Sequence, residues 1–278
     1  MTLEISHQEY VEFRDELERI SGIKLGDGKE YLISSRLRRM MQDDGLKRIG
    51  DLLHSMRSNS GLREKVIDSM TTNETLWFRD EHPYRIFRDR LLPELDQQRK
   101  PVRIWSAACS TGQEPYSLAI EMEEFRKKNP SSQAGNGRIL ATDISQSALK
   151  NAKDGCYPQL AIWRGMSEQH LKNYFHPQEG EFWQIDDRIR KRVEFRNQNL
   201  QQSFSGLGKF DVIFCRNVLI YFSADLKMDI LRRLHSCLNP GGYLILGASE
   251  SLSNQADLYE MVNCSPGIIY RAKTPFGG

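Results

Sequence analysis

Long apolar runs and paired cysteines are missing from this sequence of 278 residues. No stretch approaches the roughly 20 apolar residues of a membrane-spanning helix, and the first residues lack the basic and apolar segments of a secretion signal. The 5 cysteines are scattered, and none stands in the C-x-x-C spacing of zinc or redox sites. We therefore expect a cytoplasmic protein with reduced thiols, no metal site and no membrane insertion.

A strong charge of one sign is also lacking. Lys and Arg together number 39 and Asp and Glu 37, which gives a net charge of +2 and a pI of about 8.2. This balance disfavours nucleic acid as a partner, so any basic binding surface must be local. An Asn/Asp-Pro-Pro-Tyr motif, as in enzymes that methylate amino groups of nucleic acids, is absent too.

The pattern of the chain changes near Pro101. Residues 1–75 show only helical spacing, as in Tyr10, Phe13 and Leu17, and predict a helical domain. From residue 101 to 278 strands alternate with helices, which predicts an α/β domain with a mostly parallel sheet. We predict, in this order, strand VRIWSA, helix 115–127, strand RILATD, helix 145–153, strand FDVIFC, helix 224–237, strand GYLILG and an antiparallel edge hairpin in YEMVNCSPGIIYRAK.

Two further segments interrupt this scheme. Residues 76–100 lead into the charged run Gln97–Pro101 and are predicted to be a linker segment that carries part of the active site. Residues from about 172 to 197 show enough alternation to form a small inserted β subdomain.

The loop after the strand VRIWSA is poor in glycine. Ser106 to Gly112 contain a single glycine, whereas dinucleotide loops need several because the backbone closely approaches a pyrophosphate. Ala107, Ala108 and Gly112 leave space, and Glu114 offers an acceptor for an ammonium group. This composition favours a ligand without phosphate, and S-adenosylmethionine is one.

Other candidate ligand contacts follow strand ends, where open α/β sheets bind ligands. Asp143 ends the strand RILATD and is predicted to bind a ribose, although Asp143 or Ser145 capping the next helix is an alternative. Asn199 and Leu200 follow a strand around Val193–Phe195 and could bracket an adenine. Arg216 and Asn217 end the strand FDVIFC.

The segment MTTNETLWFRDEHPY is too polar for a simple core helix. Thr71, Thr72, Asn73 and Thr75 cluster there with Arg79. An N-capped helix with a solvated Arg79 is one interpretation, and a ligand-binding segment is the other.

Five segments together resemble, in family order, the motifs of the chemoreceptor glutamate methyltransferases, the CheR family. They are TTNETLWFRD, SAACSTGQEPYSLA, ATDIS, CRNVLIYF and LNPGGYLILGASESL, and the resemblance covers nearly the whole chain. It implies a class I S-adenosylmethionine-dependent methyltransferase fold: Rossmann-like, mostly parallel with an antiparallel edge hairpin, with a small all-helical N-terminal domain and an inserted antiparallel β subdomain.

The resemblance also implies a site and a reaction. Cofactor contacts fall on Asn73, Thr75, Arg79, Glu114, Asp143, Asn199, Leu200 and Asn217, to which we add the neighbouring Arg216. Tyr221 would lie by the methyl group, and Arg79 and Tyr221 are the expected catalytic residues. The implied substrate is a glutamate of a chemoreceptor's cytoplasmic helices, and the product is its methyl ester. Because glutamate, with a pKa of about 4.3, is ionised near pH 7, no general base is needed.

The expected receptor surface is in KEYLISSRLRRMMQDDGLKR. Arg38 and Arg39 point away from the apolar face of this predicted helix, and Arg36 flanks it. Such a run is usually a solvated face, but in the resembling family these helices approach an acidic substrate helix. Arg36, Arg38 and Arg39 are therefore predicted to bind the receptor.

Some members of that family are tethered to a pentapeptide at the receptor's carboxyl terminus through a Gly-x-Gly turn of the β subdomain. The matching stretch here is a few residues shorter and contains only Gly180. We therefore expect a monomer that does not need the pentapeptide. A small-molecule O-methyltransferase and a catalytically silent cofactor-binding signalling protein are the alternatives.

Overall fold

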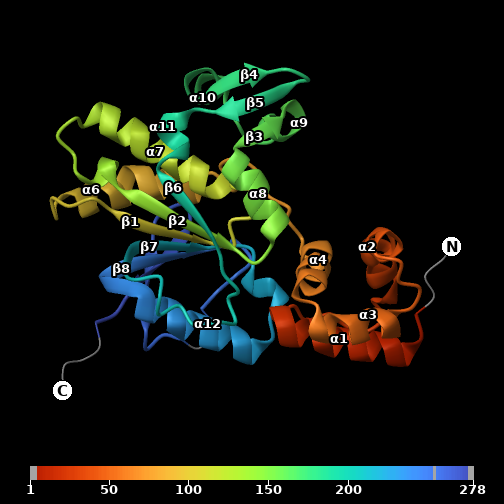
Figure 1. Cartoon of the computed structure of the whole chain (residues 1–278). Helices are drawn as coiled ribbons and strands as arrows, with labels where there is room; N and C mark the ends of the chain where they lie inside the picture. Colours follow the sequence, from red (N-terminus) through yellow and green to blue (C-terminus); the bar gives the residue numbers. More distant parts are fainter. Residues whose placement is uncertain (1–4, 253–254, 275–278) are drawn as a thin grey trace.

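The computed structural model describes residues 5–252 and 255–274. In this part of the chain, α1–α4 form a helical unit beside an α/β unit, and a small sheet stands at the far end of the α/β unit (Figure 1). The helices are α1 His7–Ser21, α2 Glu30–Asp43, α3 Ile49–Ser58, α4 Ser60–Met70, α5 His82–Ile86, η1 Phe87–Leu91, α6 Leu92–Asp96, α7 Gln113–Lys128, η2 Ala134–Asn136, α8 Gln146–Asp154, α9 Gln159–Ile162, α10 Glu168–Tyr174, α11 Asp187–Arg190, η3 Leu219–Tyr221 and α12 Ala224–Cys237.

The main sheet has the strand order β6-β2-β1-β7-β8-β10-β9. Strands β6, β2, β1, β7 and β8 are parallel, and β10 and β9 add an antiparallel edge hairpin, as the sequence predicts. The strands are β1 Arg103–Ala107, β2 Arg138–Asp143, β3 Cys156–Pro158, β4 Phe175–Gln178, β5 Phe182–Ile185, β6 Val193–Asn197, β7 Phe210–Cys215, β8 Leu238–Leu246, β9 Tyr259–Asn263 and β10 Ile268–Ala272. None of the helices in the described part is long and apolar enough to cross a membrane.

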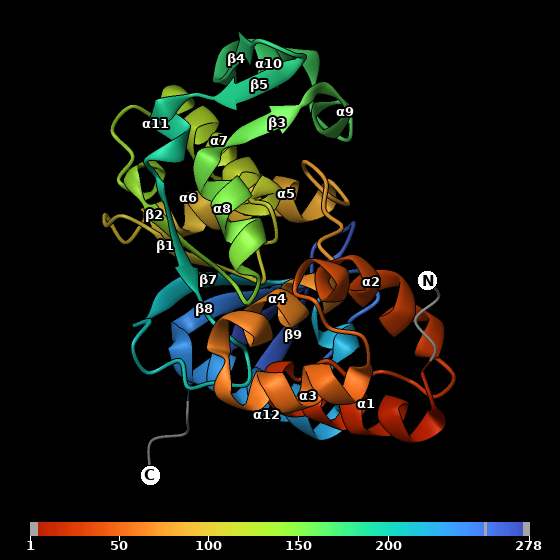
Figure 2. The same cartoon turned by 45° about the vertical axis from the view of Figure 1, so that its right-hand side comes forward.

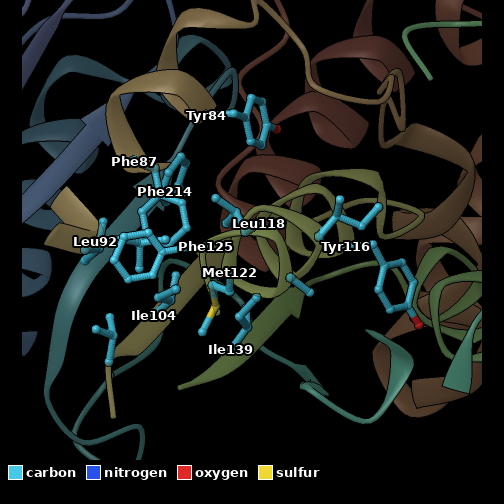
Figure 3. Packing of buried hydrophobic residues seen from close by; sticks show 14 of the residues in the cluster. Tyr84, Phe87, Leu92, Ile104, Tyr116, Leu118, Met122, Phe125, Ile139 and Phe214 are labelled. Carbon is cyan, nitrogen blue, oxygen red and sulfur yellow. The ribbon is translucent and has the colours of Figure 1, made fainter. Parts of the chain in front are cut away.

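The segment 76–100 is not a linker. It forms α5, η1 and α6, and its apolar side chains Phe87 and Leu92 are completely buried against the sheet and α7 (Figure 3). Phe87 meets Phe214 of β7 edge to face at 5.9 Å between ring centroids. The charged run that suggested a linker is confined to the last exposed residues before β1, so the segment is part of the core of the α/β unit.

The small β subdomain is assembled differently from the prediction. Its three strands have the order β3-β5-β4, so it includes Cys156–Pro158, which lies outside the predicted range 172–197. Residues 193–197 instead form β6, which pairs with β2 at the edge of the main sheet. Alternation alone could not separate these strands, because it reports a half-buried strand but not its partner.

The helical unit has a core of its own. Tyr10, Phe13 and Leu17 of α1 are buried with residues from α2, α3 and α4, which confirms their predicted helical spacing. Gly22 caps the C-terminus of α1; its φ of +78° is left-handed, and a Cβ there would lie 2.8 Å from Leu226 of α12. The glycine therefore lets the helical unit pack closely on the α/β unit. Figure 2 shows α1 lying beside α12.

Candidate active site

One cavity collects the predicted site residues at the carboxyl ends of the parallel strands. All of the residues predicted for the cofactor and for catalysis line it: Asn73, Thr75, Arg79, Glu114, Asp143, Asn199, Leu200, Arg216, Asn217 and Tyr221. The helical unit closes one side through Ser21, Ile23 and Met70. Residues more than a hundred positions apart thus meet in one place.

In the loop after β1, two residues other than glycine adopt left-handed backbone conformations. Ala108 and Ser110 have left-handed φ values of +62° and +51°. Gly112 has a φ of +95°, and a Cβ there would lie 3.0 Å from Ala152 Cβ and Tyr157 Oη. The single glycine is therefore required by packing between this loop and α8, not by the approach of a pyrophosphate.

Asp143 lies almost buried at the end of β2, with 6% of its surface exposed. Its carboxylate accepts hydrogen bonds from the amides of Ser110 at 2.7 Å and Ser145 at 2.9 Å. Burial nevertheless raises the pKa of this carboxyl group above its ordinary value. The cap of α8 is Ser145, whose Oγ accepts from the Ala148 amide, so Asp143 is not the helix cap.

Glu114 and Arg216 form a buried ion pair at the base of the cavity. Arg216 Nη1 lies 3.2 Å from Glu114 Oε2, and Ser106 Oγ donates to Glu114 Oε1 at 2.8 Å. Burial raises the pKa of Glu114, and the neighbouring guanidinium of Arg216 opposes this rise. An ammonium group of a ligand would therefore share Glu114 with these two partners.

Arg216 also fixes the segment that carries Arg79. Its Nη2 donates to the Arg79 carbonyl at 2.9 Å and to Asp80 Oδ2 at 2.7 Å. The turn here is strained, since Phe78, Asp80 and Glu81 have φ values of +48°, +66° and +46°. The side chain of Arg216, which is 1% exposed, therefore stabilises this turn from the interior of the protein.

The side chains of Arg79 and Tyr221 are both half-buried in the cavity. Arg79 donates one weak hydrogen bond, to the Glu74 carbonyl at 3.2 Å, which leaves most of its five N–H donors for a ligand. Tyr221 is held by its backbone, whose carbonyl accepts from the Lys24 amide at 2.9 Å. Among the described residues no hydrogen bond joins the two side chains.

Asn73 and Asn199 use their polar groups within the protein. The Asn73 carbonyl accepts from Ser110 Oγ at 3.0 Å, which ties the 71–75 segment to the loop after β1. Residues 71–81 form no helix, so the alternative of an N-capped helix is wrong. Asn199 Nδ2 donates to the Ile20 carbonyl at 2.9 Å, so this amide anchors α1 as well as lining the cavity.

The three arginines of α2 separate into two groups. Arg36 donates to the Met70 carbonyl at 2.6 Å and to Thr72 Oγ1 at 3.0 Å, so its guanidinium braces the segment beside the cavity. Arg38 and Arg39 are exposed and lie outside the cavity lining. Of the three predicted arginines, only these two have exposed side chains.

Two acidic residues near the site escaped the sequence analysis. Asp80 pairs with Arg216, and Glu250 accepts hydrogen bonds from the turn that follows β7. Asp80 directly follows Arg79 in the first motif, and Glu250 follows strand β8 in GASESL. Their positions, in the first motif and after a strand, could have marked them as candidates in the sequence.

The cavity fits S-adenosylmethionine in its charges. Its two buried acids, Glu114 and Asp143, suit an ammonium group and ribose hydroxyls. Of its two arginines, Arg216 is already paired with acids, so the described lining holds no cluster of free cations for phosphate. Arg216 Nε is buried without a partner among the described residues, and a ligand carboxylate would supply an acceptor.

Comparison with known proteins covers both units of the chain. The model of the CheR methyltransferase all-alpha domain matches residues 8–71, and that of the CheR methyltransferase SAM binding domain matches residues 73–268. Chemotaxis protein methyltransferase 1 of Pseudomonas aeruginosa is 53% identical over 264 residues, covering 94% of this chain and 96% of its own. Chemotaxis protein methyltransferase Cher2 of Pseudomonas putida is 50% identical over 269 residues, covering 95% and 98%.

A third relative has the same description. The chemotaxis protein methyltransferase of Vibrio anguillarum is 49% identical over 271 residues, covering 97% of this chain and 98% of its own. The boundary between the two matched domains falls just before Asn73, so the segment 76–100 lies inside the cofactor-binding domain, in agreement with its packing. With both domains matched, this chain belongs to the CheR methyltransferase family and is an S-adenosylmethionine-dependent chemotaxis methyltransferase.

Proposed function

We propose that this protein methylates glutamate side chains on the cytoplasmic helices of chemoreceptors and that it acts in the cytoplasm as a monomer. The observation that carries the proposal is the cavity, which brings Arg79 and Tyr221 together with the acids proposed to hold the cofactor. S-adenosylmethionine supplies an electrophilic methyl group when bound. The protein's own task is to orient a carboxylate and remove its water.

Arg79 is the side chain suited to that task. A guanidinium matches a carboxylate in geometry, and among the described residues the Arg79 side chain makes one weak hydrogen bond. Tyr221 lines the same cavity and could donate its hydroxyl to the carboxylate, so that Arg79 does not hold the nucleophile too tightly. Correct positioning can supply up to roughly 7–11 kcal/mol of the barrier.

Both alternative functions fit less well. A small-molecule O-methyltransferase would not need the helical unit with its exposed arginines, and a silent cofactor-binding protein would not need Arg79 and Tyr221 in the cavity. The direct test is incubation of the protein with labelled S-adenosylmethionine and receptor fragments, followed by base treatment. Release of volatile label by base supports a glutamyl methyl ester, whereas base-stable label contradicts it.

Asp143→Ala should weaken binding of S-adenosylmethionine by about 1–3 kcal/mol, because ribose hydroxyls would lose a buried partner. Calorimetric titration with the cofactor or S-adenosylhomocysteine measures this. The exposed Asp154→Ala, at the end of α8, is a matched control. Unchanged affinity in Asp143→Ala would restrict this residue to shaping the loop.

The double change Arg38→Glu with Arg39→Glu should raise the KM for receptor without changing cofactor affinity. Both side chains are exposed on α2, so added salt should also weaken the wild-type interaction through screening over about 8–10 Å. Steady-state kinetics at two ionic strengths measure both effects. An effect limited to cofactor affinity would place these arginines elsewhere in the mechanism.

A receptor tail peptide should give no detectable heat on titration, and a receptor without its tail should be methylated normally. The outer strands of the small sheet, β3 and β4, have only 3 and 4 residues. The turn between β4 and β5 contains a single glycine, Gly180. Such short edges offer few backbone groups to a peptide strand. Micromolar peptide binding would contradict this part of the proposal.

A further inference from the structure

The buried carboxylate of Glu250 has no part in the function proposed above. Glu250 is 7% exposed and follows strand β8. Most other buried acids have a basic partner, as Glu114 has Arg216, Glu121 has Arg88, Glu123 has Arg192 and Asp211 has Lys100. Among the residues that the structure describes, Glu250 has no such ion pair. Its charge must therefore be balanced in another way.

Four backbone amides converge on this carboxylate. Oε2 accepts from Asn217 at 2.7 Å and Gly247 at 2.8 Å, and Oε1 accepts from Val218 at 3.0 Å and Leu219 at 2.8 Å. Successive amides that point at one anion form a nest, and here Asn217, the first of the three successive residues, has a left-handed φ of +57°. Hydrogen bonds to an ionised acceptor are roughly twice as strong as neutral ones. Glu250 thus fixes the turn that follows β7.

This turn carries Tyr221 into the cavity. The helix η3 begins at Leu219, whose amide bonds Glu250, and the Tyr221 amide donates to the Val218 carbonyl at 3.1 Å. From the other side, the Tyr221 carbonyl accepts from Lys24 of the helical unit. Both contacts hold the backbone of Tyr221 and leave its hydroxyl group to a ligand.

Gly247 makes the close approach of Glu250 possible. A Cβ at Gly247 would lie 2.7 Å from Glu250 Oε2 and 2.8 Å from the Asn217 amide nitrogen. Since real Cβ atoms do not come so close, any larger residue must displace the carboxylate or the turn. The absence of a side chain at Gly247 is therefore needed for the contact between Glu250 and the Asn217 amide.

We propose that Glu250 is a positioning residue for methyl transfer, which acts by holding residues 217–219 in the conformation that places Tyr221 in the cavity. This inference rests on the proposed function, in which Tyr221 is catalytic. It assigns a role to the GASES segment, residues 247–251, which contains Glu250. Glu250 itself is not among the residues that line the cavity.

Glu250→Gln is the first test, because it keeps the shape but replaces one acceptor by a donor facing the amides. We expect kcat to fall about 10-fold or more, since small displacements of a catalytic group are costly. Gly247→Ala crowds the same contact independently and should lower kcat in the same way. Melting temperatures identify any variant that fails to fold. Glu260→Gln, at an exposed position on β9, is the control and should keep the wild-type kcat.

A double-mutant cycle with Tyr221→Phe separates positioning from general damage. In the Tyr221→Phe background, Glu250→Gln should lower kcat by less than about 3-fold, because the hydroxyl group that it positions is already gone. An equal loss in both backgrounds, or wild-type kcat in Glu250→Gln with an impaired Tyr221→Phe, would overturn this inference alone. Full activity of Tyr221→Phe would instead overturn the catalytic role of Tyr221 in the proposed function, and this inference with it.

Discussion

Arg79→Ala is expected to lower methyl transfer by about 10²-fold or more, as the loss of a preorganised positioning charge does. The melting temperature should change little, because the Arg79 side chain is half-buried and donates a weak hydrogen bond to the Glu74 carbonyl. The contacts that hold this turn use the Arg79 carbonyl, which alanine keeps. Catalysis and folding should therefore separate at this residue.

Single-turnover transfer to a receptor fragment, with thermal unfolding measured in parallel, provides the test. Arg85→Ala is a matched control, because Arg85 is an exposed arginine in α5 a short distance along the chain. Near-normal transfer by Arg79→Ala would remove this residue from the mechanism. A large loss of stability would show instead that it supports the fold.

Arg216→Met is expected to destabilise the protein by about 3–5 kcal/mol, the typical effect of removing one partner of a buried ion pair. It leaves Glu114, which is 8% exposed, without its cation. It also releases Asp80 and the carbonyl of Arg79, so the strained turn at residues 78–81 loses its anchor. Transfer activity should fall together with stability.

The pH dependence gives this prediction a sign. Without Arg216, the pKa of folded Glu114 should rise further, because burial then acts unopposed. An acid with a raised folded pKa lowers stability above its unfolded pKa of about 4.3, and the penalty disappears below it. The difference in stability between Arg216→Met and wild type should thus be larger at pH 8 than at pH 4.5.

Chemical unfolding at these two pH values measures both effects. Adding Glu114→Gln to Arg216→Met should recover part of the loss at pH 8, because no uncompensated carboxylate remains. Arg232→Met, at an exposed position of α12, is the control for removing an arginine. If Arg216→Met were no less stable than Arg232→Met, the buried ion pair would have no net stabilising role.

Local patterns in the sequence determined the architecture. The spacing of Tyr10, Phe13 and Leu17 predicted a helix with a buried face, and the runs RILATD and FDVIFC predicted buried strands that are β2 and β7. Helix 224–237 has the predicted bounds, and helices α7 and α8 differ from prediction by one or two residues at their ends. These features depend on neighbours within a few positions, which a sequence displays directly.

The sequence also determined which residues meet in the cavity. Here the information came from the order of the strands and from the family motifs, and not from local patterns. Parallel strands share one edge for their carboxyl ends, so residues that follow β1, β2 and β7 had to lie near each other. The motifs then added the 71–79 segment and the turn at Tyr221. The structure brings all of these residues to one cavity.

Only the tertiary structure decided how these residues are held. Arg216 pairs with Asp80 and Glu114, which lie 136 and 102 positions away, and Glu250 binds amides 31 to 33 positions away. It also decided that residues 76–100 belong to the core and that β6 pairs with β2. A charged or alternating segment shows the same local pattern whatever it packs against. Partners that lie so far apart in the sequence are decided by the topology of the chain and by the desolvation of buried charges. Neither can be read from a short window of sequence.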